Sequence, residues 1–562
     1  MDQNVLKSPI EHFYKWESGI PEKTFLRQPS GSSWQTITYG QAGQQARKLA
    51  SALQDLGLKK GSHIGIISKN CCHWIIADLA IMMAGYISVP FYASLTAKQL
   101  SEVIEKSDCV ALFVGKLEKW DSEKDKVLEK VPVIRFPQYK GGREITIGQD
   151  WTKLLQKYEP LQENVKPDLD SLWTIIFTSG TTGSPKGVMH TQRNAALLIH
   201  NEEKHNFLKT FDVPVGGNRF FSFLPLNHIA ERTAIELGSL MNGGSISFAE
   251  SLETFAQNLR DTSPTLFFAV PRIWTKFHLG VIANTPQEKL NKLLKIPLMS
   301  GMVKKKIRKA LGLKDATVML TGASITPEPL KQWYRSLGMN LREVYGMTEN
   351  FGAFTMMPDN EHRPDTVGKP IPGARGKIDP ETGEILMDLP YMMTGYYKDP
   401  ELSAETLADG WMHTGDKGEL DADGFYKVIG RVKDTFKTAK GKFVTPTVIE
   451  EEFGGQELIE QICVSGLGIA QPVAIICLSE IGQTAAQESV TSELGTQLSE
   501  VNARLEAHER LAAIVVAKEA WSDDNGMLTP TLKIRRGAIY DRYKDRLENW
   551  CECDDKIIWE KS

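Results

Sequence analysis

Several features that would place this 562-residue chain in a specialised class of protein are missing from its sequence. The seven cysteines are scattered and have no metal-ligand spacing backed by histidines, so we expect reduced thiols. Residues 1–16 contain no apolar run that could form the core of a signal peptide. The most apolar window, residues 74–93, is interrupted by Asp78, Gly85 and Pro90, which argues against a membrane span. We therefore expect a cytoplasmic protein.

A surplus of basic residues is also missing. The net charge is -4, whereas a nucleic-acid-binding protein normally has a basic surplus. No GxxxxGK[ST] spacing occurs, which argues against the chemistry of a P-loop kinase or ATPase. The apolar share of 41% and the charged share of 24% are typical of a globular protein. The chain is too long for one ordinary core, which predicts at least two domains.

The most informative stretch is residues 174–194, TIIFTSGTTGSPKGVMHTQRN. Residues 175–178 fit the end of a buried strand, and residues 179–187 must then form a loop. Its three glycines let backbone N–H groups face an anion, its four hydroxyls add donors, and Lys186 adds a cation. A flexible polar turn is the alternative, but few turns combine these residues. We therefore predict a phosphate-binding loop.

Helical and strand patterns alternate before this loop. They predict helices over 40–57, 73–84 and 96–107, and strands over 63–68, 87–92 and 110–114. Strands separated by helices of this length indicate parallel, doubly wound α/β layers. Near the C-terminus, strands over 473–478 and 513–517 and a charged helix over 495–511 indicate an α+β region.

The loop from Phe177 to Gly187 resembles the signature loop of the adenylate-forming (AMP-binding) superfamily, and further family motifs follow in the same order. These are FFSFLPLNHIAER at 220–232, MLTGAS at 319–324, VYGMTENFG at 344–352, GWMHTGDKG at 410–418, FYKVIGRVKDTFK at 425–437 and NGMLTPTLKIRR at 525–536. The motif LTPTLK is most similar to that of long-chain and bubblegum-type fatty acyl-CoA synthetases. The resemblance covers residues 170–540 by motif and 40–170 by pattern.

The resemblance implies two domains. Residues 1–430 would form a large AMP-binding domain of layered, doubly wound α/β sheets with a β-rich subdomain. Residues 431–562 would form a small, mobile α+β domain, with a hinge near 431–434. Lys433 falls where the family carries its pivoting residue, and Gly441 lies in the loop that the family brings to the thiol tunnel.

The resemblance also implies a nucleotide site. Its residues would be Ser179, Gly180, Thr181, Thr182, Gly183, Lys186, Gly322, Ala323, Ser324, Tyr345, Gly346, Thr348, Asp416 and Arg431. Tyr345 would stack on adenine, since a flat π surface suits a purine. Asp416, expected in a turn, would accept hydrogen bonds from both ribose hydroxyls, and the planar donors of Arg431 would bridge ribose and phosphate.

Three residues are implied in catalysis: Thr182, Glu349 and Lys533. Glu349 would supply an oxygen ligand to Mg²⁺, which prefers carboxylates together with substrate phosphates. Lys533 would reach across the domain interface and neutralise both the α-phosphate and the substrate carboxylate. His228 would only border the acyl pocket, because a lone histidine on an apolar stretch is more often a core or gating residue than a catalyst.

The function implied is an ATP- and Mg²⁺-dependent ligase. It would activate a medium- or long-chain fatty acid as acyl-AMP and then form the CoA thioester, with no nucleic-acid partner. One alternative is a ligase that makes acyl-AMP or loads a carrier protein or another acceptor. Another is a catalytically silent nucleotide-binding regulator, although such a relative has no chemical need for Thr182, Glu349, Asp416, Arg431 and Lys533 together. Fold-level similarity sets no oligomeric state.

One basic segment stands outside these motifs. Residues 289–314 carry nine Lys or Arg and no acid, with apolar residues interleaved. A segment of this kind suggests peripheral contact with an anionic inner membrane surface, where a long-chain acid would be found. The other interpretation is a solvated helical insertion, because charge runs are more often solvated faces.

Overall fold

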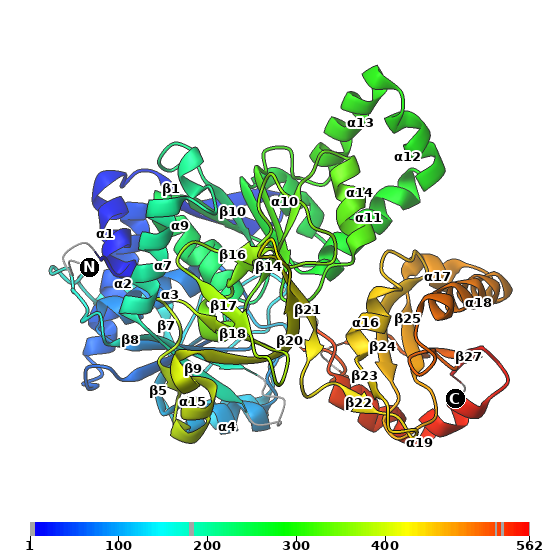
Figure 1. Ribbon diagram of the computed structural model, residues 1–562. Helices are drawn as coiled ribbons and strands as arrows, with labels where there is room; N and C mark the ends of the chain where they lie inside the picture. Colours follow the sequence, from blue (N-terminus) through cyan, green and yellow to red (C-terminus); the bar gives the residue numbers. More distant parts are fainter. Residues whose placement is uncertain (1–5, 179–184, 523–524, 530–532, 561–562) are drawn as a thin grey trace.

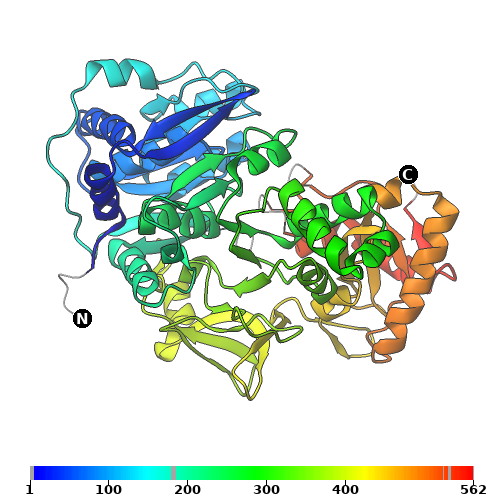
Figure 2. The same cartoon turned by 90° about the horizontal axis from the view of Figure 1, so that it is seen from above.

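The structure is a computed structural model that describes residues 6–178, 185–522, 525–529 and 533–560. Most of the chain forms a large layered body, and the C-terminal part packs beside it as a smaller unit (Figure 1). The view from above shows the same division (Figure 2). Within the described ranges, no helix is both long enough and apolar enough to cross a membrane.

The largest sheet carries the strands that lead to the phosphate loop. Its order is β19 (Gly395–Tyr396), β9 (Lys186–Thr191), β8 (Leu172–Thr178), β4 (Ile87–Phe91), β3 (His63–Ser68), β5 (Cys109–Gly115), β6 (Val133–Arg135) and β7 (Gln149–Asp150). The strands from β8 to β7 run parallel, whereas β9 pairs antiparallel with β8, and β19 pairs antiparallel with β9. The predicted alternation is confirmed, with helices α2 (Tyr39–Gln54), α3 (Cys72–Met83) and α4 (Ala97–Ser107).

Two further sheets complete the layered body. One has the order β10 (Arg219–Ser222), β11 (Ser245–Phe248), β1 (Thr24–Ser30) and β2 (Ser33–Thr38). The other has the order β12 (Leu266–Ala269), β13 (Val318–Gly322), β14 (Leu341–Tyr345), β15 (Thr355–Met356) and β16 (Lys369–Pro370). The first three strands of this second sheet are parallel, so their carboxyl ends meet at one edge.

The predicted β-rich subdomain is an antiparallel sheet. Its order is β17 (Arg375–Ile378), β18 (Glu384–Asp388), β20 (Met412–Leu420) and β21 (Tyr426–Arg431). Together with the layered sheets it confirms the predicted class of the large domain.

The smaller C-terminal unit is α+β, as predicted. Its main sheet has the order β24 (Ile459–Ser465), β25 (Val473–Leu478), β26 (Ile514–Val516) and β27 (Ile557–Trp559). Helices α16 (Pro446–Glu451), α18 (Gln487–Arg504) and α19 (Arg536–Glu552) accompany it. The helix predicted over 495–511 begins and ends earlier, because Val490, Leu494, Leu498 and Val501 form its buried stripe.

The apolar cores support the proposed boundary between residues 430 and 431. In the larger unit, the main core includes Tyr426, and Val428 packs against it. The two cores of the smaller unit contain buried residues only from Val444 onward. Between them, the exposed Lys433 lies in the turn that follows β21. The boundary and the hinge remain our proposal.

Candidate functional site

The predicted site lies where several strands end. β8 ends at Thr178, directly before the predicted phosphate loop, and β13 ends beside β14, where Gly322 pairs with Val344. A Cβ on Gly322 would lie 2.5 Å from the Val344 carbonyl oxygen, so only glycine fits there. The predicted contacts of Ser179, Gly180, Thr181, Thr182 and Gly183 lie outside the described residues, as these five positions do.

Asp416 is a buried carboxylate at the centre of a polar cluster. The Tyr345 hydroxyl donates to Asp416 Oδ2 at 2.7 Å, and Arg431 Nε lies 2.7 Å from Asp416 Oδ1. Burial raises the pKa of Asp416, and the Arg431 charge opposes this shift. Each carboxylate oxygen keeps a further lone pair for a ligand hydroxyl. The arrangement suits the predicted binding of ribose.

The prediction that Asp416 occupies a turn is wrong. Asp416 lies within β20, directly opposite Arg431 in β21. The preceding Gly415 has a φ of +70° and lies where the pairing of β20 with β18 shifts register, between the pairs Glu384–Lys417 and Leu386–His413. The strand pairing therefore fixes the Asp416–Arg431 contact.

Glu349 occupies a second part of the site. It lies in a short 3₁₀ turn, Thr348–Asn350, after β14, and the Tyr396 hydroxyl donates to its Oε1 at 2.7 Å. Lys186 Nζ lies 5.4 Å from the centre of the Tyr396 ring, which places the cation of the phosphate loop beside Glu349's partner. Tyr396 therefore connects β9 and β19 to the predicted metal ligand.

The surroundings of Glu349 fit Mg²⁺ rather than a metal held by protein alone. Within the described ranges, no group of three or more His, Cys, Asp or Glu side chains is placed to hold a metal ion. Mg²⁺ is usually bound by one or two carboxylates and substrate phosphates. Glu349, near the phosphate loop, matches that pattern.

Lys533 reaches this site from the C-terminal unit. Its backbone N–H donates to Thr529 Oγ1 at 3.0 Å, and a β-bridge between Leu528 and Ile534 flanks it. Burial and the Arg431 charge lower the pKa of Lys533 to about 8, while Asp416 and Glu349 act in the opposite direction. The Lys533 ammonium therefore interacts electrostatically with Asp416 and Glu349 of the larger unit and with Arg431 at the boundary.

His228 interacts electrostatically with the same ammonium. Burial and the Lys533 charge lower the pKa of His228 to about 3, so its imidazole is neutral at pH 7. Its Nδ1 accepts from the Ala230 N–H at 3.2 Å and caps a short helix, Ile229–Glu231. The sequence did not predict the helix-capping role of His228 or its interaction with Lys533. The position of His228 at an acyl pocket stays a prediction.

Two supporting residues were missed in the sequence. One is Tyr396, described above. The other is His190, whose Nε2–H donates to the Thr348 carbonyl at 2.8 Å, while burial lowers its pKa to about 4. His190 lies four residues after Lys186, and Tyr396 lies in TGYY, but neither position reveals its partner in another segment.

A buried ion cluster supports the strand that enters the phosphate loop. Arg232 is fully buried, and its guanidinium lies 2.7 Å from both Asp78 and Glu236. It also donates to Thr174 Oγ1 in β8 at 2.8 Å and lies over the Trp173 ring. Removing one member of such a cluster leaves a buried charge uncompensated, so the cluster holds β8 in place.

Gly441 lies apart from these groups. It occupies the tip of the hairpin β22 (Phe436–Lys437) and β23 (Phe443–Val444), with a φ of +76°. Apart from chain neighbours, a Cβ there would meet only Lys437, at 3.6 Å. The structure therefore brings Lys533 to the site but leaves Gly441 at an exposed hairpin.

Two family descriptions match this chain. The one named AMP-binding enzyme matches residues 13–397, and the one named AMP-binding enzyme C-terminal domain matches residues 433–553.

Individual proteins are similar over nearly the whole chain. Long-chain-fatty-acid–CoA ligase FadD15 of Mycobacterium bovis is 26% identical, over 97% of this chain and 96% of its own. Long-chain-fatty-acid–CoA ligase ACSBG2 of Rattus norvegicus is 26% identical, over 93% and 90%. The solved A-PCP didomain of carboxylic acid reductase from Segniliparus rugosus, in complex with AMP, gives a TM-score of 0.82 at 21% identity, over 97% of this chain and 82% of that chain. The last likeness concerns the fold alone.

Proposed function

The chain belongs to the AMP-binding enzyme family, and from this we propose that it is an ATP-dependent ligase that joins a medium- or long-chain fatty acid to CoA. Its relatives include two long-chain-fatty-acid–CoA ligases that match 97% and 93% of the chain. The observation that supports the proposal most is the position of Lys533 among Asp416, Arg431 and Glu349.

In the first half-reaction, the fatty-acid carboxylate attacks the α-phosphorus of ATP, and pyrophosphate leaves. Tyr345 and Asp416 position the nucleoside, and Lys533 neutralises the two anions as they approach, so no proton transfer is needed. Glu349 would hold Mg²⁺ together with phosphate oxygens, and the ion supplies neutralising charge.

In the second half-reaction, the CoA thiol attacks the acyl carbonyl of acyl-AMP, and AMP leaves. Lys533 must withdraw to make room for the pantetheine, which requires the small domain to rotate. We place the pivot at Lys433, in the exposed turn after β21, and the thiol tunnel at Gly441. Alternation of this kind separates two reactions that use one pocket.

The test measures pyrophosphate release from ATP with a series of fatty and aryl acids of different size, each with and without CoA. We expect release with medium or long acids and multiple turnovers only when CoA is present. Release that does not depend on CoA would favour a ligase for acyl-AMP or a carrier protein. ATP binding without release would favour the silent regulator.

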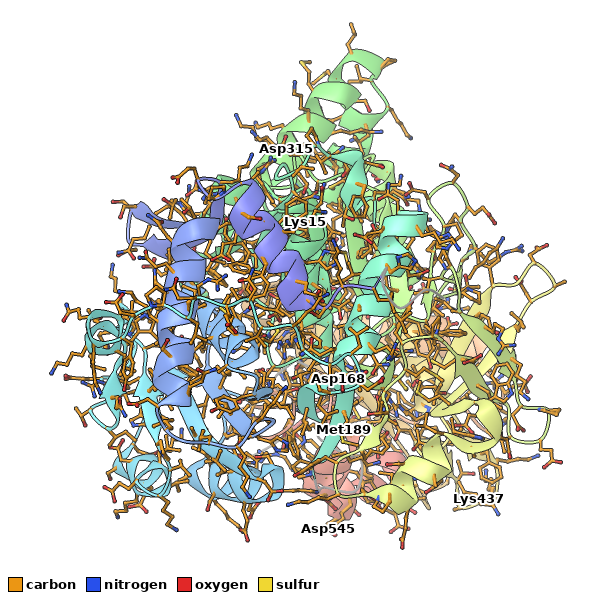
Figure 3. All side chains as sticks on the ribbon, turned by 90° about the vertical axis from the view of Figure 1, so that its left-hand side faces the viewer. Lys15, Asp168, Met189, Asp315, Lys437 and Asp545 are labelled. Atoms are coloured by element: carbon orange, nitrogen blue, oxygen red, sulfur yellow. The ribbon has the colours of Figure 1, made fainter. Side chains whose placement is uncertain are left out.

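We further propose that residues 289–314 contact an anionic membrane surface. They include most of α12 (Gln287–Leu294) and all of α13 (Pro297–Ala310), which project from the body of the molecule (Figure 1). Figure 3 shows their side chains reaching away from the body, with Asp315 beyond α13 tied to the body by Arg219. No residue of α13 is buried.

Helices α12 and α13 form a helical hairpin, and along α13 its exposed apolar side chains precede its exposed lysines. Leu298 and Met302, near the start of α13, are 86% and 64% exposed. Lys305 and Lys309 continue the same helical face at i+3 and i+7 from Met302 and are also exposed. An apolar tip followed by lysines matches an anionic bilayer, with the tip in the interface and the ammonium groups at the phosphates.

Reversing three charges of the hairpin should weaken membrane binding. Exchange of Lys304, Lys305 and Lys306 for Glu is expected to lower binding to phosphatidylglycerol vesicles at least about tenfold, because each lysine near the surface contributes attraction. Co-sedimentation measures this, with Lys59, Lys60 and Lys98 reversed as a variant of equal charge. Equal binding by both variants would support the solvated insertion instead.

A further inference from the structure

Lys533 can act on the site only while the smaller unit keeps its present orientation. An ion pair crosses the boundary between the two units. Arg272 Nη2 and Nε lie 2.8 and 3.1 Å from Glu460 Oε1, and both side chains are largely buried, at 22% and 16% exposure. Both nitrogens donate to the same carboxylate oxygen, and hydrogen bonds between charged groups are about twice as strong as those between neutral groups.

The two partners stand on rigid elements. Arg272 is the second residue of α11 (Pro271–Asn284), which follows β12, and β12 pairs with β13, whose end at Gly322 borders the predicted adenine site. Glu460 lies in β24, which pairs with the central strand β25 of the smaller unit. The pair therefore joins the nucleotide side of the larger unit to the core of the smaller one.

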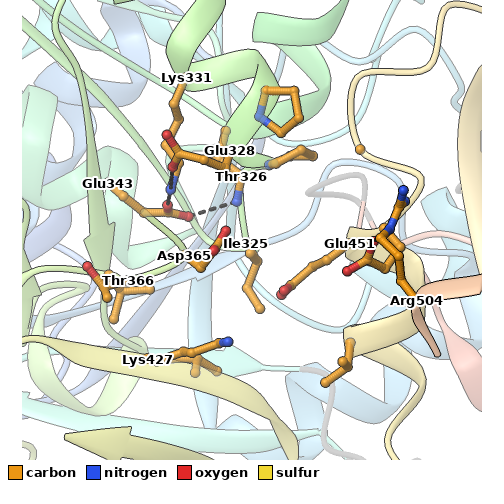
Figure 4. Close-up of a pocket in the computed structure, with 17 residues that line it drawn as sticks. Ile325, Thr326, Glu328, Lys331, Glu343, Asp365, Thr366, Lys427, Glu451 and Arg504 are labelled. Carbon is orange, nitrogen blue, oxygen red and sulfur yellow. Dashed lines mark hydrogen bonds and ion pairs between the residues drawn. The ribbon is translucent and has the colours of Figure 1, made fainter. Parts of the chain in front are cut away.

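The rest of this interface is poorly suited to holding the orientation by packing. It contains a cavity of about 290 Å³ that is lined by both charged and apolar residues (Figure 4). Glu451 from α16 faces Lys427 from β21 across this cavity, while Lys331 bonds Glu343 at 2.6 Å behind it. Side chains that line a cavity do not pack against the opposite unit there, so this part of the interface gains less from apolar burial, and a charge-assisted contact elsewhere adds specificity.

One close contact shows that the surfaces are nevertheless matched. A Cβ on Gly454 would lie 2.3 Å from Pro327 Cβ, so glycine is required there. Ile481, from α17 (Glu480–Thr484), also packs against a core cluster of the larger unit. These contacts allow approach in this orientation, and the ion pair adds direction to it.

From these contacts we propose that Arg272 and Glu460 are positioning residues that hold Lys533 over the site during acyl-adenylate formation. The inference rests on the proposed function, because it assigns the pair to one half-reaction. Rotation of the small domain would break the pair and return both charges to water. The ion pair therefore stabilises the domain orientation in which acyl-AMP forms. It is not needed in the orientation in which CoA reacts.

The test separates the two half-reactions in the full-length protein. Arg272→Glu and Glu460→Arg are each expected to slow pyrophosphate release from ATP and laurate about three- to tenfold, the scale of a partly buried pair. Thioester formation from supplied lauroyl-AMP and CoA should be unchanged or faster. The double exchange should restore pyrophosphate release, which a merely misfolded single variant would not allow. Arg375→Glu, which breaks a pair inside the large domain, is the matched control.

A second readout does not depend on catalysis. Lys433 is exposed in the turn between the units, so trypsin can cleave after it. Loss of the ion pair should let the smaller unit move more, and cleavage should therefore be faster in both single variants. In the double exchange the cleavage rate should return to that of the wild type. Equal losses in both half-reactions, or no restoration by the exchange, would overturn the positioning role. Inactive wild-type protein would contradict the proposed function instead, and the trypsin rates would still decide whether the pair sets the orientation.

Discussion

Lys533→Ala is expected to lower the rate of acyl-adenylate formation by a factor of about 100 to 1,000, the usual cost of removing one preorganised charge or donor from a transition state. Thiolysis of supplied acyl-AMP should stay near the wild-type rate, because the ammonium must leave before the thiol enters. Pyrophosphate release without CoA measures the first step, and thioester formation from acyl-AMP measures the second.

The pH dependence gives the Lys533 prediction an independent check. The pKa of Lys533 is lowered to about 8, so its ammonium is present below that pH and is lost as the pH rises through it. The kcat/KM of adenylation, which reports the free enzyme, should therefore fall above about pH 8. Lys533→Arg keeps its charge throughout this range, so its profile should lack the fall.

Two outcomes would contradict this role. Equal loss of both half-reactions in Lys533→Ala would mean that the lysine supports the fold or the general binding of nucleotide. An unchanged fall above pH 8 in Lys533→Arg would assign that titration to another group. The trypsin cleavage rate at Lys433 provides the control that the variant keeps the orientation of its domains.

Gly441→Leu is expected to have the opposite effect, with thiolysis lowered about 100-fold and adenylation nearly unchanged, because a small misplacement of reacting groups costs about that much. In the present orientation Gly441 lies at an exposed hairpin tip, where a Cβ would meet only Lys437. After rotation, the isobutyl group would occupy the path that we assign to the pantetheine. The same two assays measure the effect.

Backbone strain needs a separate control in the Gly441 experiment. The φ of +76° disfavours any side chain, so leucine costs roughly 1–2 kcal/mol whether or not a tunnel exists. Gly424 has a φ of +85° and open space around its Cβ position, in the turn between β20 and β21. Gly424→Leu imposes the same strain elsewhere. Equal thiolysis in the two variants would remove Gly441 from the tunnel.

Local patterns predicted the elements of the fold well. The strand over 63–68 has the predicted bounds, and the helices around it end within three residues of their predicted limits. The period of apolar residues and the positions of glycines are local properties of the sequence. They therefore predict helices and strands without knowledge of the tertiary structure. Gly322 is different, because the atom that leaves no room for a Cβ there is the Val344 carbonyl oxygen of the neighbouring strand β14. The turn predicted at Asp416 was wrong, because this residue lies in β20 and pairs with Arg431 of β21.

The partnerships within the site could not be predicted in this way. Tyr345 with Asp416, Tyr396 with Glu349, and Arg272 with Glu460 each join residues that lie 47 to 188 positions apart. Such pairs depend on strand order and domain packing, which no local pattern contains. The acyl pocket has the same origin, so the chain length of the acid follows from its depth rather than from any motif.

By itself, the sequence determined the family, the α/β and α+β classes of the two units, and the kinds of groups that bind nucleotide, since each depends on residue type in a short motif. The tertiary structure alone decided that Lys533 lies among Asp416, Arg431 and Glu349 with a lowered pKa, and that Gly441 lies outside that cluster. The physical reason is that burial and charge proximity are sums over neighbours from distant segments, and only the folded chain brings those segments together.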